Sequence, residues 1–316
     1  MDIIKLNNLT KKFGELTAVD NVSFSVKEGE IFGFLGPNGA GKTTTVSMLT
    51  TLKEKTSGEA FVNGYDISKD KGNVRQSIGI VFQEPSLDNE LTVYENLKFH
   101  AMMYGMPGEK TEQRIKDMLG LVDLYDKRKV LAGKLSGGMK RRLEIARGFI
   151  HYPKVLFLDE PTVGLDPQTR HHIWEYIEKL NKKEKVTVIL TTHYMEEAEK
   201  LAHRIAIMDH GKIIALDTPT KLKNMTEGEK VSIETPDTEK VYKKLKKLDV
   251  KIEQYNEYLD LTTKNGDLSE LLRAVINSGC KIRSISVHKP TLEDVYIHLT
   301  GKRLREEGIS KKVKLR

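Results

Sequence analysis

The sequence has few cysteines and no long apolar runs. Its single cysteine, Cys280, cannot form an internal disulfide bond and matches no metal-ligand spacing, so we expect a reducing, cytoplasmic environment. No run approaches about 18 apolar residues, which argues against a membrane-spanning helix. The segment 1–10 also lacks the continuous apolar stretch of a signal peptide.

The sequence also has little net charge outside its C-terminal end. It carries 52 Lys and Arg against 45 Asp and Glu, a net charge of +7. Residues 301–316 hold seven basic and two acidic side chains, so +5 of the +7 lies there. The near-neutral remainder gives no support for a basic nucleic-acid-binding face, and we expect no nucleic-acid partner. The basic tail is either solvated or in contact with an anionic membrane surface or a partner.

The 316 residues, 38% of them hydrophobic, are enough for one large globular domain or two. Four buried parallel strands are predicted, at Ile31–Leu35, Ile78–Phe82, Val155–Leu158 and Val186–Leu190. Helical periodicity separates them, which indicates an α/β fold with a largely parallel sheet. Short strands of an adjoining antiparallel layer are predicted at Ile3–Leu6, Leu16–Val19, Val22–Val26 and Ala60–Val62.

A helical subdomain is predicted at about 84–150. Thr92 and Glu95 have the spacing of a capping box, and a second helix is expected at about Glu109–Leu121. This region is rich in aromatic and Met side chains, namely Tyr94, Phe99, Met102, Met103, Tyr104 and Met106. We interpret them as core residues, with an adaptable apolar docking surface as the alternative.

The pattern changes again after about residue 226. Strands are predicted at Val231–Glu234, Val250–Gln254, Tyr258–Thr262 and Lys281–Val287, with helices at Thr238–Leu248 and Leu268–Ser278. The order β-α-β-β-α-β is typical of a ferredoxin-like α+β domain. A final helix is expected at Thr291–Leu299. We therefore divide the chain into a domain at 1–225, an accessory or regulatory domain at 226–300 and a basic tail at 301–316.

The segment Gly36–Thr43 matches the phosphate-binding pattern G-x-x-x-x-G-K-[ST]. With Gly at ~7%, a chance match in a chain of this length has odds of about one in a hundred. The segment follows a predicted strand and opens a predicted helix at Gly41–Leu52. Its glycines let backbone N–H groups surround phosphates, Lys42 reaches the β- and γ-phosphates, and Thr43 binds Mg²⁺. The sequence therefore predicts a site for a nucleoside triphosphate.

Polar side chains also follow the other predicted strands. Asp159, directly after one strand, suits Mg²⁺ binding, and Glu160 is placed to act as general base toward the attacking water. Gln83 and His193 follow two further strands, and His193 is a candidate contact to the γ-phosphate. Because open parallel sheets bind ligands at the carboxyl ends of their strands, we expect these residues to meet at one edge.

Ser136, Gly137 and Gly138 begin a predicted helix and form a possible second anion site. An ordinary capped helix explains the same residues. Two phosphate sites in one chain would be unusual unless they serve different copies of the protein. A P-loop kinase or GTPase without a membrane partner leaves this segment unexplained.

Six segments resemble, in order, the Walker A, Q-loop, signature, Walker B, D-loop and H-loop motifs of ABC transporter ATPase subunits: Gly36–Thr43, Gln83, Leu135–Arg142, Leu158–Thr162, Gly164–Pro167 and His193. Met139 replaces the commoner Gln of the signature. The resemblance spans residues 1 to about 225. The segment Ser286–Gly301 resembles the C-terminal extension of the daunorubicin-type drug-resistance exporter ATPases.

This resemblance implies a P-loop NTPase that hydrolyses ATP with Mg²⁺ and acts as a head-to-tail homodimer, with each ATP between one copy's Walker A and the other's signature. It implies a separate integral-membrane permease, a location on the inner face of the cell membrane, and export of a drug, lipid or polysaccharide. The alternative is a non-transport ABC ATPase acting on RNA, DNA or ribosomes.

The resemblance also assigns residue roles. The nucleotide-binding residues it implies are Phe13 (stacked on adenine), Gly36, Asn38, Gly39, Gly41, Lys42, Thr43, Thr44, Ser136, Gly137, Gly138 and Asp166 (across the dimer). The catalytic residues it implies are Glu160, His193 and Gln83, and the Mg²⁺ ligands are Thr43, Gln83 and Asp159.

Overall fold

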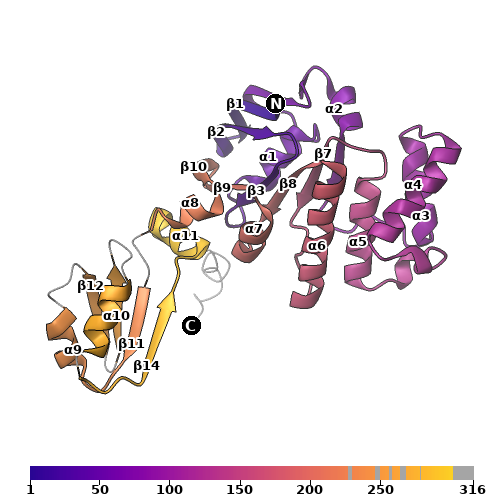
Figure 1. The fold of residues 1–316 in the computed structure, drawn as a ribbon. Coiled ribbons are helices and arrows are strands. Elements are labelled where there is room, and N and C mark those ends of the chain that lie inside the picture. Colours follow the sequence, from indigo (N-terminus) through magenta and orange to yellow (C-terminus); the bar gives the residue numbers. More distant parts are fainter. Residues whose placement is uncertain (227–229, 246–249, 256–257, 264–267, 278, 302–316) are drawn as a thin grey trace, which may run out of the picture. The chain divides into compact units, whose positions relative to one another are not determined.

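The computed structural model describes residues 1–226, 230–245, 250–255, 258–263, 268–277 and 279–301 (Figure 1). The chain forms two compact units, and the boundary lies between Thr218 and Pro219. Helix α8 (Pro219–Lys223), expected in the first domain, thus belongs to the second unit. Apart from Gly301, the basic tail predicted at 301–316 lies outside the described residues.

The first unit is built around a six-stranded sheet with the strand order β10-β9-β3-β8-β7-β6. Its strands are β3 (Ile31–Leu35), β6 (Ile78–Val81), β7 (Val155–Asp159), β8 (Thr187–Thr192), β9 (Arg204–Asp209) and β10 (Lys212–Asp217). The five strands from β9 to β6 pair in parallel, and only β10 at the edge is antiparallel. The largely parallel sheet is confirmed; the sequence analysis had not identified β9 and β10.

A four-stranded antiparallel layer with the order β2-β1-β4-β5 adjoins this sheet. Its strands are β1 (Asp2–Phe13), β2 (Leu16–Lys27), β4 (Ser57–Val62) and β5 (Tyr65–Asp66). The short strands predicted in the first thirty residues were wrong in length, because β1 and β2 are each 12 residues long. Register shifts along the β1–β2 pair allow both strands to continue past the points where the alternation of apolar residues breaks.

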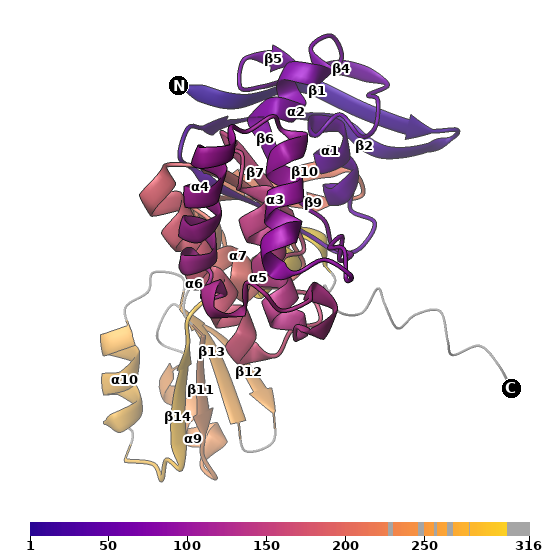
Figure 2. The same cartoon turned by 90° about the vertical axis from the view of Figure 1, so that its right-hand side faces the viewer.

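Helices cover the first unit, and Figure 2 shows α3, α4 and α5 side by side. The helices are α1 (Lys42–Leu49), α2 (Lys71–Ser77), α3 (Val93–Met103), α4 (Gly108–Leu121), α5 (Gly137–Gly148), α6 (Pro167–Glu184) and α7 (Met195–Leu201). Alternating residues of β7 enter two cores: Leu156 and Leu158 pack toward α3–α6, whereas Val155 and Phe157 pack toward α1 and the antiparallel layer.

The N-terminus of α3 carries the predicted capping box between Thr92 and Glu95. The prediction that the region's aromatic and Met side chains lie in the core was wrong for Phe99, Met102 and Met103, which are 60–68% exposed. The residues of α3 buried in the core are Val93, Asn96, Leu97 and Ala101. The i, i+4, i+8 stripe therefore turns the opposite face to solvent. Tyr104 is also exposed, whereas Tyr94 and Met106 pack partly against the core.

Near the C-terminus of α3, His100 and His151 lie close together, with Tyr104 stacked on His151 at 3.6 Å between ring centroids. Burial, with the positive charge of Arg147 or Arg114 nearby, lowers the pKa of each histidine from 6.5 to about 4. Between pH 4 and 6.5, both histidines are neutral in the folded chain, whereas they bind protons in the unfolded chain. The stability they contribute is therefore complete above pH 6.5 and is lost as the pH falls toward 4.

We expect lowering the pH from 7.5 to 5 to cost on the order of 1–2 kcal/mol of unfolding free energy for each of these two half-buried histidines. His100→Gln should remove about half of that dependence. His172→Gln, at an exposed histidine of α6, is the matched control and should leave it unchanged. Urea denaturation at the two pH values measures the effect; equal pH dependence in all three proteins would contradict it.

The second unit contains a four-stranded antiparallel sheet with the order β12-β13-β11-β14. Its elements are β11 (Lys230–Glu234), α9 (Thr238–Leu245), β12 (Val250–Tyr255), β13 (Tyr258–Thr263), α10 (Leu268–Ile276), β14 (Ser284–His288) and α11 (Leu292–Thr300). This order and pairing confirm the ferredoxin-like fold. The strand expected from Lys281 begins only at Ser284, and α11 ends before Gly301, whose φ is 73°.

None of the helices in the described ranges is long and apolar enough to cross a membrane.

Candidate nucleotide-binding site

The strand order brings the predicted site residues to one edge of the sheet. The loop after β3 contains Gly36, and Glu160 directly follows β7. His193 directly follows β8, and Gln83 lies two residues after β6. Since these four strands are consecutive neighbours in the order β3-β8-β7-β6, their carboxyl ends form a continuous rim.

The loop between β3 and α1 adopts a shape that only glycine permits at key positions. A Cβ atom on Gly36 would lie 2.3 Å from the carbonyl oxygen of Met208. Gly41 has a φ of 101°, and a Cβ there would lie 2.5 Å from the carbonyl oxygen of Ala18. The loop leads directly into α1, whose N-terminus has no side-chain cap. Its backbone N–H groups are therefore available to an anion.

Lys42 lies across this loop. Its Nζ donates to the carbonyl oxygens of Gly36 at 2.7 Å and Pro37 at 2.9 Å. Burial lowers the pKa of Lys42, and the nearby carboxylates of Glu160 and Asp159 oppose that shift. A buried cation held only by neutral carbonyls is placed to exchange them for phosphate oxygens.

Thr43 and Asp159 join the loop to the end of β7. The Thr43 hydroxyl donates to Asp159 Oδ1 at 3.1 Å, and the Thr191 hydroxyl donates to the same oxygen at 2.5 Å. Hydroxyl and carboxylate oxygens are the ligands that Mg²⁺ prefers, so this pair fits that ion. The sequence analysis missed Thr191; its position directly after the predicted strand Val186–Leu190, two residues before His193, was the available signal.

Glu160 is a buried carboxylate with an unusual backbone. Its φ is +46°, in the left-handed region that non-glycine residues rarely occupy. Its N–H donates to the carbonyl and the hydroxyl oxygens of Thr191, and its Oε1 lies 3.1 Å from His193 Nδ1. Burial raises the pKa of Glu160, but the hydrogen bond and charge of His193, with Lys42, outweigh it and leave the pKa below its usual value. Glu160 is therefore ionised near neutral pH.

The other predicted residues around the loop are more exposed. Gln83 and Asn38 are exposed, and Thr44 is half-buried. Phe13, at the end of β1, is also exposed, with the Nζ atoms of Lys11 and Lys53 at 5.0 and 5.1 Å from its ring centroid. A flat ring beside two cations is compatible with stacking against a purine.

Ser136, Gly137 and Gly138 lie at the start of α5. Ser136 caps the helix by accepting the Met139 N–H at 3.4 Å, and Asp166 caps α6 by accepting the Thr169 N–H at 2.9 Å. A cavity of about 260 Å³ there is lined by Asp123, Ser136, Gly138, Met139, Arg142, Thr169, His172, Ile173 and Tyr176. Among the described residues, no hydrogen bond joins this segment to the Gly36–Thr43 loop.

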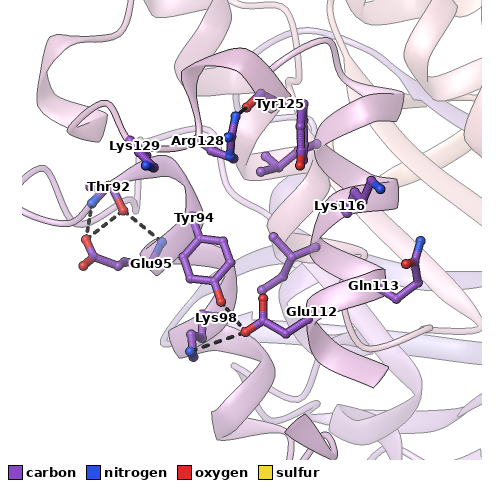
Figure 3. A pocket seen from close by; sticks show the side chains of 12 residues that line it. Thr92, Tyr94, Glu95, Lys98, Glu112, Gln113, Lys116, Tyr125, Arg128 and Lys129 are labelled. Carbon is purple, nitrogen blue, oxygen red and sulfur yellow. Dashed lines mark hydrogen bonds and ion pairs between the residues drawn. The ribbon is translucent and has the colours of Figure 1, made fainter. Parts of the chain in front are cut away.

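A larger cavity, of about 700 Å³, lies between α3 and α4 and contains none of the predicted site residues. Figure 3 shows Tyr94 and Lys98 both directed at Glu112, and Arg128 beside Tyr125. This cavity is separate from the nucleotide site.

The glycine loop with Lys42, the hydrogen-bonded Thr43–Asp159 pair and the buried Glu160 beside His193 are the features of a P-loop nucleotide-binding protein. Comparisons with known proteins identify it further. Residues 19–163 match the ABC transporter family, and residues 218–300 match the C-terminal domain of DrrA1-3-like ATP-binding proteins. The chain therefore belongs to the ABC transporter family, as an ATP-binding subunit of the drug-resistance type.

Three relatives illustrate the match. The linearmycin resistance ATP-binding protein LnrL of Bacillus subtilis is 39% identical over 96% of this chain and 100% of its own length. The Nod factor export ATP-binding protein I of Burkholderia lata is 38% identical over 96% and 98%. A solved dimeric ATP-binding cassette in a post-hydrolysis state, bound to ADP and phosphate, has a TM-score of 0.61 and 31% identity, over 68% of this chain and 98% of that one.

Proposed function

We propose that this protein is the ATP-hydrolysing subunit of an exporter, and that it works through a separate membrane permease. The observation that supports the proposal most is the contact chain at the sheet edge, in which Thr43 bonds to Asp159 and Glu160 bonds to His193 beside the buried Lys42. Hydrolysis of Mg·ATP by the purified chain, and its stimulation when the chain is reconstituted with its permease, test the proposal.

Each residue has a distinct role in this proposal. Lys42 leaves the Gly36 and Pro37 carbonyls and binds the β- and γ-phosphates, while Gly36–Thr43 N–H groups surround them. Thr43 and Asp159, with Gln83 as the third proposed ligand, would hold Mg²⁺, which would neutralise phosphate charge. Glu160, ionised because His193 holds its pKa low, orients the attacking water and accepts its proton.

The second anion site fits a head-to-tail homodimer. Ser136, Gly137 and Gly138 present a helix N-terminus that does not bond to the nucleotide loop of the same chain. In the proposed dimer they contact the ATP held by the other copy, with Asp166 across the interface. The related cassette was solved as a dimer with ADP and phosphate, which supports this assembly.

The exposed face of α3 supports the proposal that this protein has a membrane partner. Phe99, Met102 and Met103 are exposed apolar side chains on one face of α3 in the helical subdomain, and Met side chains adapt to varied partners. We propose that a permease helix docks there, which would place the protein on the inner face of the membrane. The relatives' names, resistance and export, favour export of a drug, lipid or polysaccharide over action on nucleic acids or ribosomes.

Replacing Phe99 and Met103 with Ser should impair binding to the permease without impairing ATP hydrolysis. We expect the double variant to keep the intrinsic ATPase rate but to lose co-purification with the permease by ~10-fold or more, because docking apolar side chains carry much of an interface's binding energy. Leu16→Ser, at an exposed apolar residue of β2, is the matched control. Undiminished permease recovery with the double variant would rule out this docking face.

We propose an accessory role for the ferredoxin-like unit, either stabilising the dimer or regulating it. Truncation after residue 225 should then weaken dimer formation while ATP binding is retained.

A further inference from the structure

Arg141, on α5, is a buried arginine whose guanidinium hydrogen-bonding capacity is fully used. Its side chain is about 8% exposed. Its Nε donates to the Pro161 carbonyl at 2.7 Å, and Nη1 donates to the Phe82 carbonyl at 2.5 Å and to Glu144 Oε2 at 3.0 Å. Its Nη2 donates to the carbonyls of Asp159 and Glu160 at 3.1 and 3.2 Å. A guanidinium has five N–H donors, and each has an acceptor here.

Four of these five acceptors are backbone carbonyls in two segments of the nucleotide site. One segment contains Phe82, which immediately precedes Gln83. The other runs from Asp159 at the end of β7 through Glu160 to Pro161. Because the guanidinium is planar and rigid, these bonds fix the two segments relative to each other and to α5.

Glu144 completes the arrangement one turn further along α5. It is 2% exposed, its Oε2 accepts from Arg141, and its Oε1 accepts the N–H of Ser86 at 2.7 Å. The Arg141–Glu144 pair therefore holds the chain on both sides of Gln83, at Phe82 and at Ser86. The exposed Gln83 side chain itself stays available to a ligand.

Arg141 and Thr191 together explain how Glu160 keeps a strained backbone. A non-glycine residue in the left-handed region costs on the order of 1–3 kcal/mol unless the surroundings enforce it. Thr191 binds the Glu160 N–H, and Arg141 binds its carbonyl oxygen, so both peptide groups flanking the strained residue are held.

We propose that Arg141, supported by Glu144, is a positioning residue that sets the geometry of Glu160 and Gln83 from the signature helix. The inference rests on the role proposed above for Glu160. Arg141 does not touch the nucleotide; it acts through the backbone of the residues that do.

Arg114 provides a matched control for a purely structural role. It is also a buried arginine, 3% exposed, and it donates to the carbonyls of Phe149 and Ile150 and to Glu184. It bonds to the same kinds of group as Arg141, but its partners lie at the C-terminal ends of α5 and α6 and include no predicted site residue. Arg114→Met should therefore reduce stability without a specific effect on hydrolysis.

The experiment compares Arg141→Met with Arg114→Met in the purified full chain. We expect Arg141→Met to lower kcat by ~10²-fold with KM for ATP within ~3-fold, because a small misplacement of a catalytic group costs about that much. Arg114→Met should lower the Tm comparably and keep kcat within ~3-fold. Wild-type kcat in Arg141→Met, or equal loss in both variants, would overturn the proposal.

Two further variants keep the test decisive. If Arg141→Met fails to fold, Glu144→Gln keeps the shape of its partner and should lower kcat ~10-fold; an unchanged kcat there overturns the proposal. Adding Arg141→Met to Glu160→Gln should slow single-turnover hydrolysis no further, since the two act as a unit. Additive losses would refute action through Glu160, whereas full activity of Glu160→Gln alone would instead refute the proposed function.

Discussion

Glu160→Gln should lower ATP turnover by ~10²–10⁴-fold while the protein still binds Mg·ATP. The amide keeps the size of the side chain and its contact with His193, but it cannot accept a proton from water. Because ATP stays intact, the closed homodimer should accumulate. Steady-state phosphate release, binding of a fluorescent ATP analogue and size-exclusion chromatography with ATP measure the three effects.

Glu196→Gln is the control for that change. Glu196 lies in the first turn of α7 and is exposed, so the same replacement there should leave turnover unchanged. Turnover at the wild-type rate in Glu160→Gln would remove Glu160 from the role of general base. Loss of nucleotide binding in that variant would indicate that its effect lies in the fold of the site instead.

Gly137→Glu should abolish ATP-dependent dimerisation and lower turnover by ~10²–10³-fold, the range seen when anion-binding donors are lost. The chain has room for the new side chain, since a Cβ on Gly137 would have only Leu165 Cδ2 near it, at 3.9 Å. A carboxylate in the first turn of α5 also suits the helix dipole, so the fold should not suffer. The added charge would instead repel the phosphates held by the partner copy.

The monomer should therefore bind ATP as tightly as the wild type, because the Lys42 loop is untouched. Gly120→Glu is the matched control: Gly120 is an exposed glycine of α4 with open space around it, and the same charge there should change neither property. An ATP-dependent dimer of Gly137→Glu, seen by light scattering, would contradict the proposed place of the signature helix.

The exposed side chains of α3 show where pattern analysis fails. Val93, Leu97 and Ala101 fill the buried stripe of the helix, so Phe99, Met102 and Met103 cannot reach the core. Their hydrophobicity alone predicted burial. Hydrophobic composition reports the tendency to leave water, but it does not say whether a side chain meets the protein core or another surface.

The full length of β1 and β2, and the strand pair β9–β10 altogether, were missed for a related reason. Register shifts interrupt the alternation of apolar residues in β1 and β2 without ending their backbone pairing. In β9 the apolar run Ile205–Met208 is short. One partner strand, β3, is distant in the sequence, and the pairing with the other, β10, contains a register shift. Strand pairing is a non-local property, so short apolar runs leave it undecided.

The sequence by itself determined the chemistry of the nucleotide site, because glycines, a lysine and a hydroxyl at fixed spacing act over one short loop. It also determined the order of elements in the C-terminal unit. The tertiary structure decided that β3, β8, β7 and β6 are neighbours, and so that Thr43 reaches Asp159 and His193 reaches Glu160. It alone revealed the contacts of Arg141, four of whose five acceptors are backbone carbonyls of residues 18 to 59 positions away. Carbonyls carry no side-chain signature, so no pattern of residue types could have disclosed that contact.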